Sequence, residues 1–322
     1  MASRTVSLIE RDLSLGRRLG EISMLLVISL GLATCSQGRM EGSASGGGLK
    51  VVATTTIVGD VARQIGGEWI DLTVLLPVGV DTHAFEATPQ DVARVAEADV
   101  VFANGAGLEV FLDALIRNAG GQAEIVYVSE GIELRGFGVT GQEAESAATD
   151  PHVWTDPNNV MVWTRNIERV LSSLDSAHAA DYRANAEKFR RELEMLDLWA
   201  REQIDLIPRE NRKLVTDHAV FGYLALRYGL EQVGTVVPGY TTLAQPSAQD
   251  LAALEDAIRA HNVKAVFVGN TVNPSLAERV AADTGVRLVF LLTESLAAPG
   301  SEAGTYLGYT RHNVSAIVEA LR

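Results

Sequence analysis

The strongest constraint on the fold is a repeated alternation of short apolar runs with amphipathic helical patterns. From residue 50 onward, strand-like runs such as Lys50–Thr54 and Asp99–Ala103 each precede a segment whose apolar residues recur at helical spacing. Neighbouring parallel strands need a crossover connection, which is usually a helix. The alternation therefore predicts an α/β protein whose parallel sheets are covered by helices on both faces.

Prolines and apolar spacing predict where several helices lie. Pro89 and Pro157 are expected at the first turns of helices that continue to Ala98 and about Leu174, because proline is favoured in a first helical turn. A further helix is expected over Leu108–Ala119. These helices fall between predicted strands, as a parallel sheet requires.

One helical pattern is unusually long. It runs from Ala177 to about Leu206 without Gly or Pro. A helix of about 30 residues spans roughly 45 Å, which is longer than one lobe needs. We interpret it as a rigid strut between two similar halves. The expected fold is α/β with two lobes, each with a mostly parallel four-stranded sheet flanked by helices, linked by this one long helix.

The N-terminus has the features of an export signal. Arg17 and Arg18 precede the apolar run Met24–Leu32, which is too short to span a membrane and suits the core of a signal peptide. Cys35, the one cysteine of the chain, follows directly, and Leu32–Cys35 resembles a bacterial lipobox. This resemblance implies that Cys35 is lipidated. A buried free thiol and an ordinary signal peptide cut nearby are the alternatives.

Together these features predict five parts in the chain. They are a signal peptide (1–34), a lipidated cysteine with a flexible Gly/Ser-rich tether (35–48), an N-terminal lobe (49–175), a linking helix (176–207) and a C-terminal lobe (208–322). The expected location is outside the cytoplasmic membrane, on its outer face. A formal net charge of −14 argues against nucleic acid as a partner.

Three histidines and one glutamate are candidate metal ligands. His83, His152, His218 and Glu294 each lie at the end of a predicted strand or in the loop after it, about 70 residues apart. A local zinc finger closes its ligands within a few dozen residues, so this spacing indicates instead a site shared by two lobes, with two ligands from each. Three imidazoles and a carboxylate suit Zn²⁺ and tolerate Mn²⁺.

The segments around these residues resemble the zinc- and manganese-specific solute-binding receptors of bacterial ABC transporters. The resemblance runs from about residue 49 to the C-terminus. The four motifs that carry it are Gly79–Pro89, Asp150–Pro157, Thr216–Tyr223 and Thr293–Leu296. It implies a monomeric, lipid-anchored receptor that binds one divalent metal and presents it to a membrane permease driven by an ATPase. Family members carry His or Glu at the third ligand, and the histidine at position 218 goes with zinc.

Several alternatives remain at this stage. A manganese or dual-metal receptor would use the same four ligands. A zinc hydrolase would use three histidines and an open water position, but the sequence has no His-Glu-x-x-His helix and no nucleophile motif. An adhesin-like surface lipoprotein is a third alternative, which is compatible with metal capture and cell adhesion.

Other polar residues near the motifs have simpler explanations. The remaining histidines are expected to be solvated or to cap helices: His178, His261 and His312. Three acids are candidates for fixing a histidine tautomer, or are surface acids of loops: Asp81, Asp156 and Asp217. Trp154 is expected to pack in the core.

Overall fold

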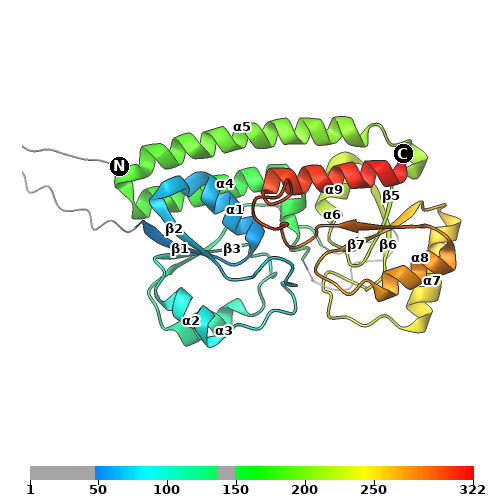
Figure 1. Cartoon of the computed structure of the whole chain (residues 1–322), viewed down its shortest axis with the longest axis horizontal. Coiled ribbons are helices and arrows are strands. Elements are labelled where there is room, and N and C mark those ends of the chain that lie inside the picture. Colours follow the sequence, from blue (N-terminus) through cyan, green and yellow to red (C-terminus); the bar gives the residue numbers. More distant parts are fainter. Residues whose placement is uncertain (1–47, 137–148) are drawn as a thin grey trace, which may run out of the picture. The chain divides into compact units, whose positions relative to one another are not determined.

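The computed structural model describes residues 48–136 and 149–322. The predicted signal peptide, Cys35 and the tether to residue 47 lie outside the described residues, as does the interior of the polar loop that follows Gly136. Two parallel sheets organise the described chain (Figure 1).

The first sheet has the strand order β2-β1-β3-β4, and every pair in it is parallel. Its strands are β1 (Leu49–Ala53), β2 (Ile70–Val74), β3 (Val100–Ala103) and β4 (Glu124–Tyr127). The residues of β3 are all buried, as expected for a central strand covered on both faces.

The second sheet repeats this arrangement, with the order β6-β5-β7-β8 and parallel pairs throughout. Its strands are β5 (Lys213–Thr216), β6 (Glu231–Thr235), β7 (Ala265–Gly269) and β8 (Arg287–Leu291). The predicted α/β fold with two four-stranded parallel sheets is therefore confirmed. We call the sheets with their covering helices the first and the second lobe.

Helices flank both sheets. The α-helices are α1 (Thr56–Gly66), α2 (Pro89–Ala96), α3 (Leu112–Ala119), α4 (Pro157–Leu174), α5 (Ala179–Ile204), α6 (Gly222–Tyr228), α7 (Ala248–Ala260), α8 (Ser275–Thr284) and α9 (Tyr306–Leu321). Short 3₁₀ helices are η1 (Gly67–Trp69), η2 (Val153–Thr155), η3 (Ser176–His178) and η4 (Arg209–Asn211). Among the helices of residues 48–136 and 149–322, none is long and apolar enough to cross a membrane.

Local chemistry explains the helix starts. Pro89 and Pro157 begin α2 and α4 as predicted, and a capping box of Thr88 with Asp91 completes the first turn of α2. The expectation of a helix from Leu108 was wrong, because α3 begins at Leu112. Residues 105–107 all have positive φ and turn the chain after β3, which delays the helix.

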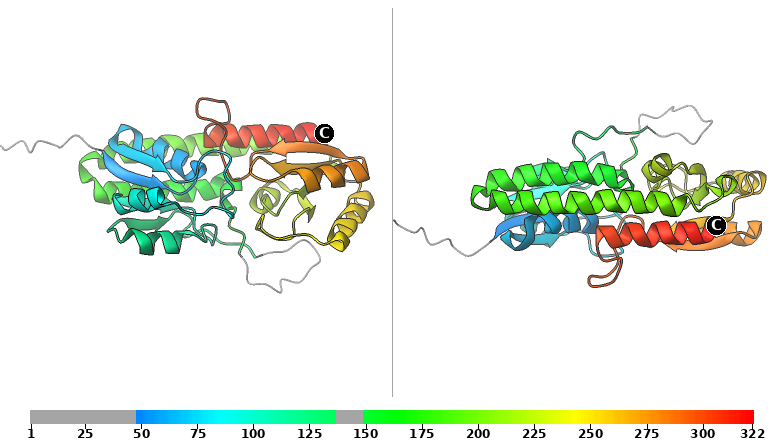
Figure 2. Two further views of the ribbon diagram at one scale, coloured as in Figure 1. Left: turned by 60° about the horizontal axis from the view of Figure 1, so that its bottom comes forward. Right: turned by 90° about the horizontal axis from the view of Figure 1, so that it is seen from above.

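The long helix is shorter than predicted. In place of a linking helix over 176–207, the chain forms η3 and then α5, whose 26 residues span about 39 Å. Its first part, including Tyr182 and Phe189, lies in the apolar core that also holds β1 and β3, whereas Ala200 and Ile204 lie in the core below β5 and β7. The helix therefore packs on both lobes, as the strut interpretation requires (Figure 2).

A second helix also joins the lobes, which the sequence pattern did not indicate. The first part of α9 places Tyr306 and Tyr309 in the core of the first lobe, and its second part places Val314 and Ile317 in that of the second. Helices α5 and α9 pack against each other. Two continuous helices across both lobes oppose a wide hinge movement between them.

Candidate metal centre

The four candidate ligands come from loops at the carboxyl ends of strands. His218 and Glu294 closely follow β5 and β8, whereas His83 and His152 lie farther along the loops after β2 and β4. In open parallel α/β sheets, bound molecules and ions occupy the crevice outside the carboxyl ends of the strands. The topology therefore brings loops from both lobes to one place.

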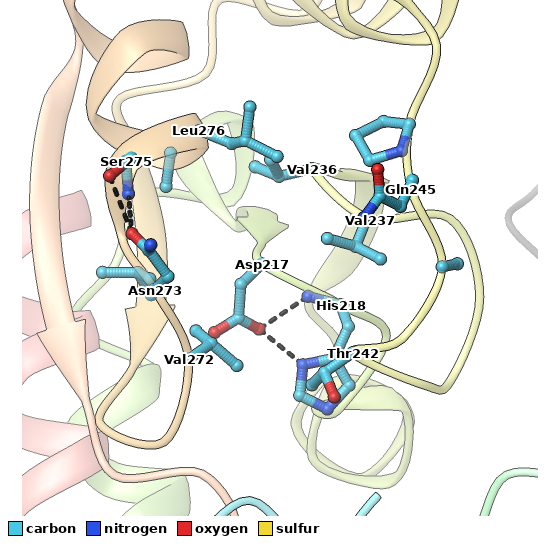
Figure 3. A pocket seen from close by; sticks show the side chains of 14 residues that line it. Asp217, His218, Val236, Val237, Thr242, Gln245, Val272, Asn273, Ser275 and Leu276 are labelled. Carbon is cyan, nitrogen blue, oxygen red and sulfur yellow. Dashed lines mark hydrogen bonds and ion pairs between the residues drawn. The ribbon is translucent and has the colours of Figure 1, made fainter. Parts of the chain in front are cut away.

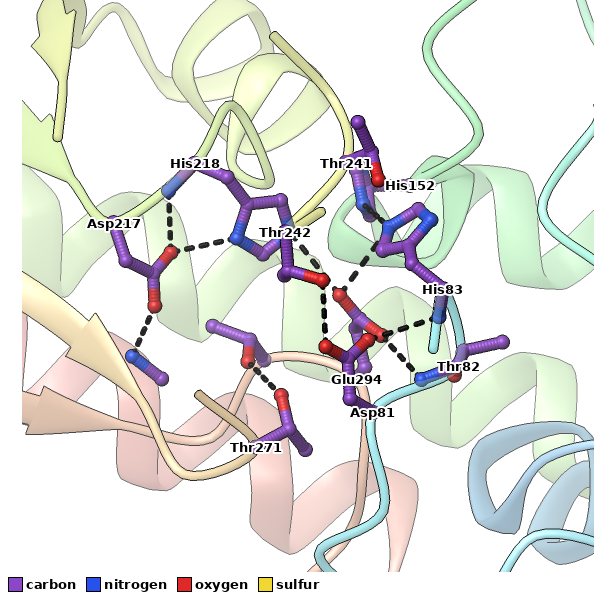
Figure 4. A network of polar contacts seen from close by, with 12 residues as sticks. Asp81, Thr82, His83, His152, Asp217, His218, Thr241, Thr242, Thr271 and Glu294 are labelled. Atoms are coloured by element: carbon purple, nitrogen blue, oxygen red, sulfur yellow. Dashed lines mark hydrogen bonds and ion pairs between the residues drawn. The ribbon is translucent and has the colours of Figure 1, made fainter. Parts of the chain in front are cut away.

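At this place the four side chains converge (Figure 4). Each offers one ligand atom, and these atoms all lie within 4.8 Å of one another. His152, His218 and Glu294 are buried, and His83 is nearly so. The sequence-based expectation that both lobes bring these residues together agrees with this geometry.

Three of the six donor separations match the edges of a coordination tetrahedron. Bonds of about 2.0–2.1 Å from a zinc ion to N or O donors place neighbouring donors about 3.3 Å apart. His83 Nε2 lies 3.4 Å from His152 Nε2 and 3.4 Å from Glu294 Oε1. His218 Nε2 lies 3.1 Å from Glu294 Oε1. The donor set is therefore sized for one small cation.

Two of these donors lack a hydrogen-bond partner although they are buried. His218 Nε2 and Glu294 Oε1 have none among the residues that the structure describes, although the two atoms lie 3.1 Å apart as an ion pair. Both atoms face the space between the four side chains, so a bound cation would satisfy them.

Two aspartates set the histidine tautomers. Asp150 Oδ1 lies 2.9 Å from His152 Nδ1, and Asp217 Oδ1 lies 2.7 Å from His218 Nδ1. A carboxylate only accepts hydrogen bonds, so each Nδ1 carries the proton, and the lone pair of a neutral ring is on Nε2, toward the site. The contact of Asp217 with His218 agrees with the expectation that Asp217 fixes a histidine tautomer. Sequence reasoning missed Asp150, although Asp150-Pro151-His152 repeats the Asp-x-His pattern of Asp81-Thr82-His83.

The other two acids have different roles. Asp81 Oδ1 accepts from the backbone N–H of His83 at 2.9 Å rather than from its ring, and Asp81 Oδ2 accepts from the Thr242 hydroxyl of the second lobe at 2.5 Å. The suggestion that Asp156 orients a histidine was wrong, because its side chain caps α4 by accepting from Asn158 N–H at 2.8 Å.

The remaining histidines lie elsewhere, as expected. His178 stacks on Trp69 and pairs with Asp175 at 2.6 Å. His261 follows the end of α7, and His312 is exposed on α9. Trp154 is buried, as predicted, and its indole N–H donates to the Thr293 carbonyl oxygen and the Tyr309 hydroxyl.

Electrostatics at the site favour an ionised glutamate. Burial raises the pKa of Glu294, but His218 and His83 outweigh burial and lower it to about 2. Burial lowers the pKa of His218, but Asp217 and Glu294 outweigh burial and raise it to about 10. Burial lowers the pKa of His83 to about 4, with partial opposition from Glu294. Without a metal, the site at neutral pH therefore holds a proton on His218.

Glu294 also links the lobes directly. Its Oε2 accepts a hydrogen bond at 2.9 Å from the backbone N–H of Thr82 in the first lobe. Beside it, the Ser295 hydroxyl accepts from Gly79 N–H at 2.8 Å. These bonds leave Oε1 as the oxygen of Glu294 that is directed toward the histidines.

A separate cavity of about 400 Å³ lies in the second lobe next to His218 (Figure 3). Its walls are mostly aliphatic, with Val236, Val268 and Leu276 among them, and Asp217 and His218 also line it. One water occupies about 30 Å³ in the liquid, so this space is far larger than a single ion needs. The cavity is therefore not the coordination space, which lies between the four converging donors.

Comparison with known proteins agrees with this geometry. The manganese-binding lipoprotein MntA of Halalkalibacterium halodurans is 33% identical over 299 residues, which cover 92% of this chain and 97% of that protein. The manganese ABC transporter substrate-binding lipoprotein PsaA of Streptococcus anginosus is 30% identical over 312 residues, or 95% of this chain and 99% of that protein.

Solved structures give the same result. The periplasmic zinc binding protein TroA from Treponema pallidum superposes with a TM-score of 0.78 at 28% identity, covering 85% of this chain and 99% of that chain. An Mn-bound periplasmic metal binding protein from Candidatus Liberibacter asiaticus gives 0.75 at 26% identity, covering 85% and 100%. Residues 51–320 match the family described as zinc-uptake complex component A, periplasmic. The resemblance seen in the four motifs is thus confirmed, and the chain belongs to this family.

Proposed function

We propose that the chain is the extracytoplasmic receptor of a metal ABC transporter that binds one divalent transition metal through His83, His152, His218 and Glu294 and delivers it to the membrane permease. The observation that carries this proposal is the convergence of four buried donors from two lobes, two of them without a hydrogen-bond partner among the described residues. A cation held by both lobes couples its binding to their relative position.

Relatives named as substrate-binding lipoproteins support a receptor. The chain is therefore not an enzyme, and the zinc-hydrolase alternative is set aside. The same names support lipidation of Cys35 after removal of the signal peptide, with the protein anchored on the outer face of the cytoplasmic membrane. We also propose that the receptor is a monomer.

We propose zinc as the metal that binds most tightly. Three imidazole nitrogens and one carboxylate are a borderline-soft set, and affinity at such sites is far higher for Zn²⁺ than for Mn²⁺. Glu294 is expected to ligate through Oε1 alone, since Oε2 already accepts from Thr82 N–H. The manganese-binding names of relatives support the alternative that manganese is the cargo in the cell.

Competition between the two metals tests this proposal. We expect purified protein exposed to equal Zn²⁺ and Mn²⁺ to retain zinc, with a Kd for manganese higher by about 100-fold or more. In the variant His218→Glu, a carboxylate replaces an imidazole, and the ratio of the two Kd values should fall by about tenfold. Preferential retention of manganese by the unaltered protein would overturn the choice of ion. Retention of neither metal would overturn the function.

Metal binding should release a proton at neutral pH. The pKa of His218 near 10 means that the metal-free site holds this proton at pH 7, and a metal must displace it to reach Nε2. The apparent Kd should therefore fall about tenfold per pH unit as pH rises toward 10, and level off above it. Isothermal calorimetry at pH 7 in two buffers of different ionisation enthalpy measures the release. We expect about one proton per metal, and a value near zero would contradict the protonated site.

A further inference from the structure

We propose that Asn104 is a positioning residue for the metal centre, because it holds the peptide unit that carries His152. The inference rests on the proposed function and adds a residue from outside the four donors. Asn104 directly follows β3 and is fully buried. Its influence on the metal would pass through the backbone.

The peptide unit between Pro151 and His152 is held at both ends. The carbonyl oxygen of Pro151 accepts from Asn104 Nδ2 at 3.0 Å and from Val153 N–H at 2.9 Å. The N–H of His152 donates to Asp150 Oδ1 at 2.9 Å. Because a peptide unit is planar, contacts at both ends fix its orientation, and with it the direction in which the His152 side chain leaves the backbone.

The contacts of Nδ2 determine the orientation of the Asn104 amide, whose Oδ1 has no hydrogen-bond partner among the described residues. Its Nδ2 lies 2.8 Å from the carbonyl oxygen of Gly105 and 3.0 Å from that of Pro151. Both partners only accept hydrogen bonds, so the NH₂ group must face them. The side chain therefore ties the turn after β3 to the loop that ends at His152.

Glu109 fixes Asn104 in turn. This buried carboxylate accepts from the backbone N–H groups of Asn104 and Gly105, at 2.6 and 2.9 Å, and from the Thr54 hydroxyl at 2.7 Å. Three donors on one carboxylate hold the turn at residues 105–107, where every φ is positive. The position of Asn104 is thus determined by contacts that do not involve the four metal donors.

The second lobe holds its own histidine by the same two-ended restraint. The carbonyl oxygen of Asp217 accepts from Val237 N–H at 2.7 Å, and His218 N–H donates to Asp217 Oδ1 at 2.6 Å. In the first lobe the Asn104 side chain donates to the Pro151 carbonyl in addition to the backbone N–H of Val153. The long-range part of the restraint on His152 can therefore be removed by one substitution.

Asn104→Ala and Asn166→Ala form a matched pair for the test. Asn166 on α4 also donates through Nδ2 to two loop carbonyls, those of Val128 and Glu130, both at 2.9 Å, but it does not hold the His152 peptide. Zinc affinity is measured by competition with a chromophoric chelator, and the geometry of the site by the visible absorption of bound Co²⁺. Thermal unfolding of both variants records their general loss of stability.

We expect Asn104→Ala to raise the Kd for zinc by about 10- to 100-fold and to change the Co²⁺ spectrum, as loss of outer partners of metal ligands does. Asn166→Ala should lower Tm but leave the Kd within about twofold. If Asn104→Ala does not fold, Asn104→Ser takes its place with the same expectation. An unchanged Kd, or an equal rise in both variants, would overturn the inference alone. Failure of the unaltered protein to bind zinc would overturn the proposed function as well.

Discussion

Replacing His152 or His218 by alanine is expected to weaken zinc binding by about 100-fold or more. Structural zinc sites with four ligands bind with about 10–16 kcal/mol, so one ligand accounts for about 3 kcal/mol, or two decades in Kd. His152 lies in the first lobe and His218 in the second, and both side chains are fully buried. Competitive titration of each variant measures the effect.

His312→Ala is the matched control. This substitution also removes an imidazole, but His312 is exposed on α9 and lies away from the site. Its Kd should equal that of the unaltered protein. Similar losses in the two buried-site variants are expected, because the ion needs donors from both lobes. A large loss in one variant with none in the other would mean that a single lobe holds the metal.

Zinc is expected to raise the Tm of the protein by about 8 °C. A ligand at 1,000 times its Kd stabilises the folded state by about 4 kcal/mol. The entropy of unfolding grows with chain length, so for a chain of 322 residues 1 kcal/mol shifts Tm by about 2 °C. Calorimetric scans before and after addition of a chelator measure the shift.

Magnesium at the same concentration is the control for this shift. It prefers oxygen ligands in octahedral geometry, so it should leave Tm unchanged. At the same zinc concentration, the variants His152→Ala and His218→Ala should each show at most about a third of this shift, because a 100-fold weaker site is only about 10 times above its Kd. A zinc shift below about 2 °C in the unaltered protein, or an equal shift with magnesium, would contradict a shared imidazole site.

The fold was predictable because its signals are local. Apolar runs alternate with helical patterns, and Pro89 and Pro157 stand at helix starts. The start of α3 was not predictable in this way, since the turn at residues 105–107 depends on the buried contacts of Glu109. The apolar stripe of α9 indicates a helix but does not say that it packs on both lobes.

The same distinction between local signals and contacts of distant segments applies to the site. His83, His152 and His218 stand in recognisable motifs. The pairing of Asp150 with the His152 ring does not follow from its Asp-x-His pattern, because in the same pattern Asp81 accepts from the His83 backbone N–H. The contact of Asn104 with the Pro151 carbonyl joins segments far apart in the sequence. This contact has no local sequence signature. In the sequence alone, Asn104 cannot be distinguished from an ordinary asparagine of a loop.

Anomalous X-ray diffraction from crystals of the zinc-loaded protein tests the central claim most directly. We expect one strong peak between the lobes, within about 2.0–2.2 Å of Nε2 of each of the three site histidines and of Glu294 Oε1. A peak bound by residues of one lobe alone, or located away from His83, His152 and His218, would contradict the account.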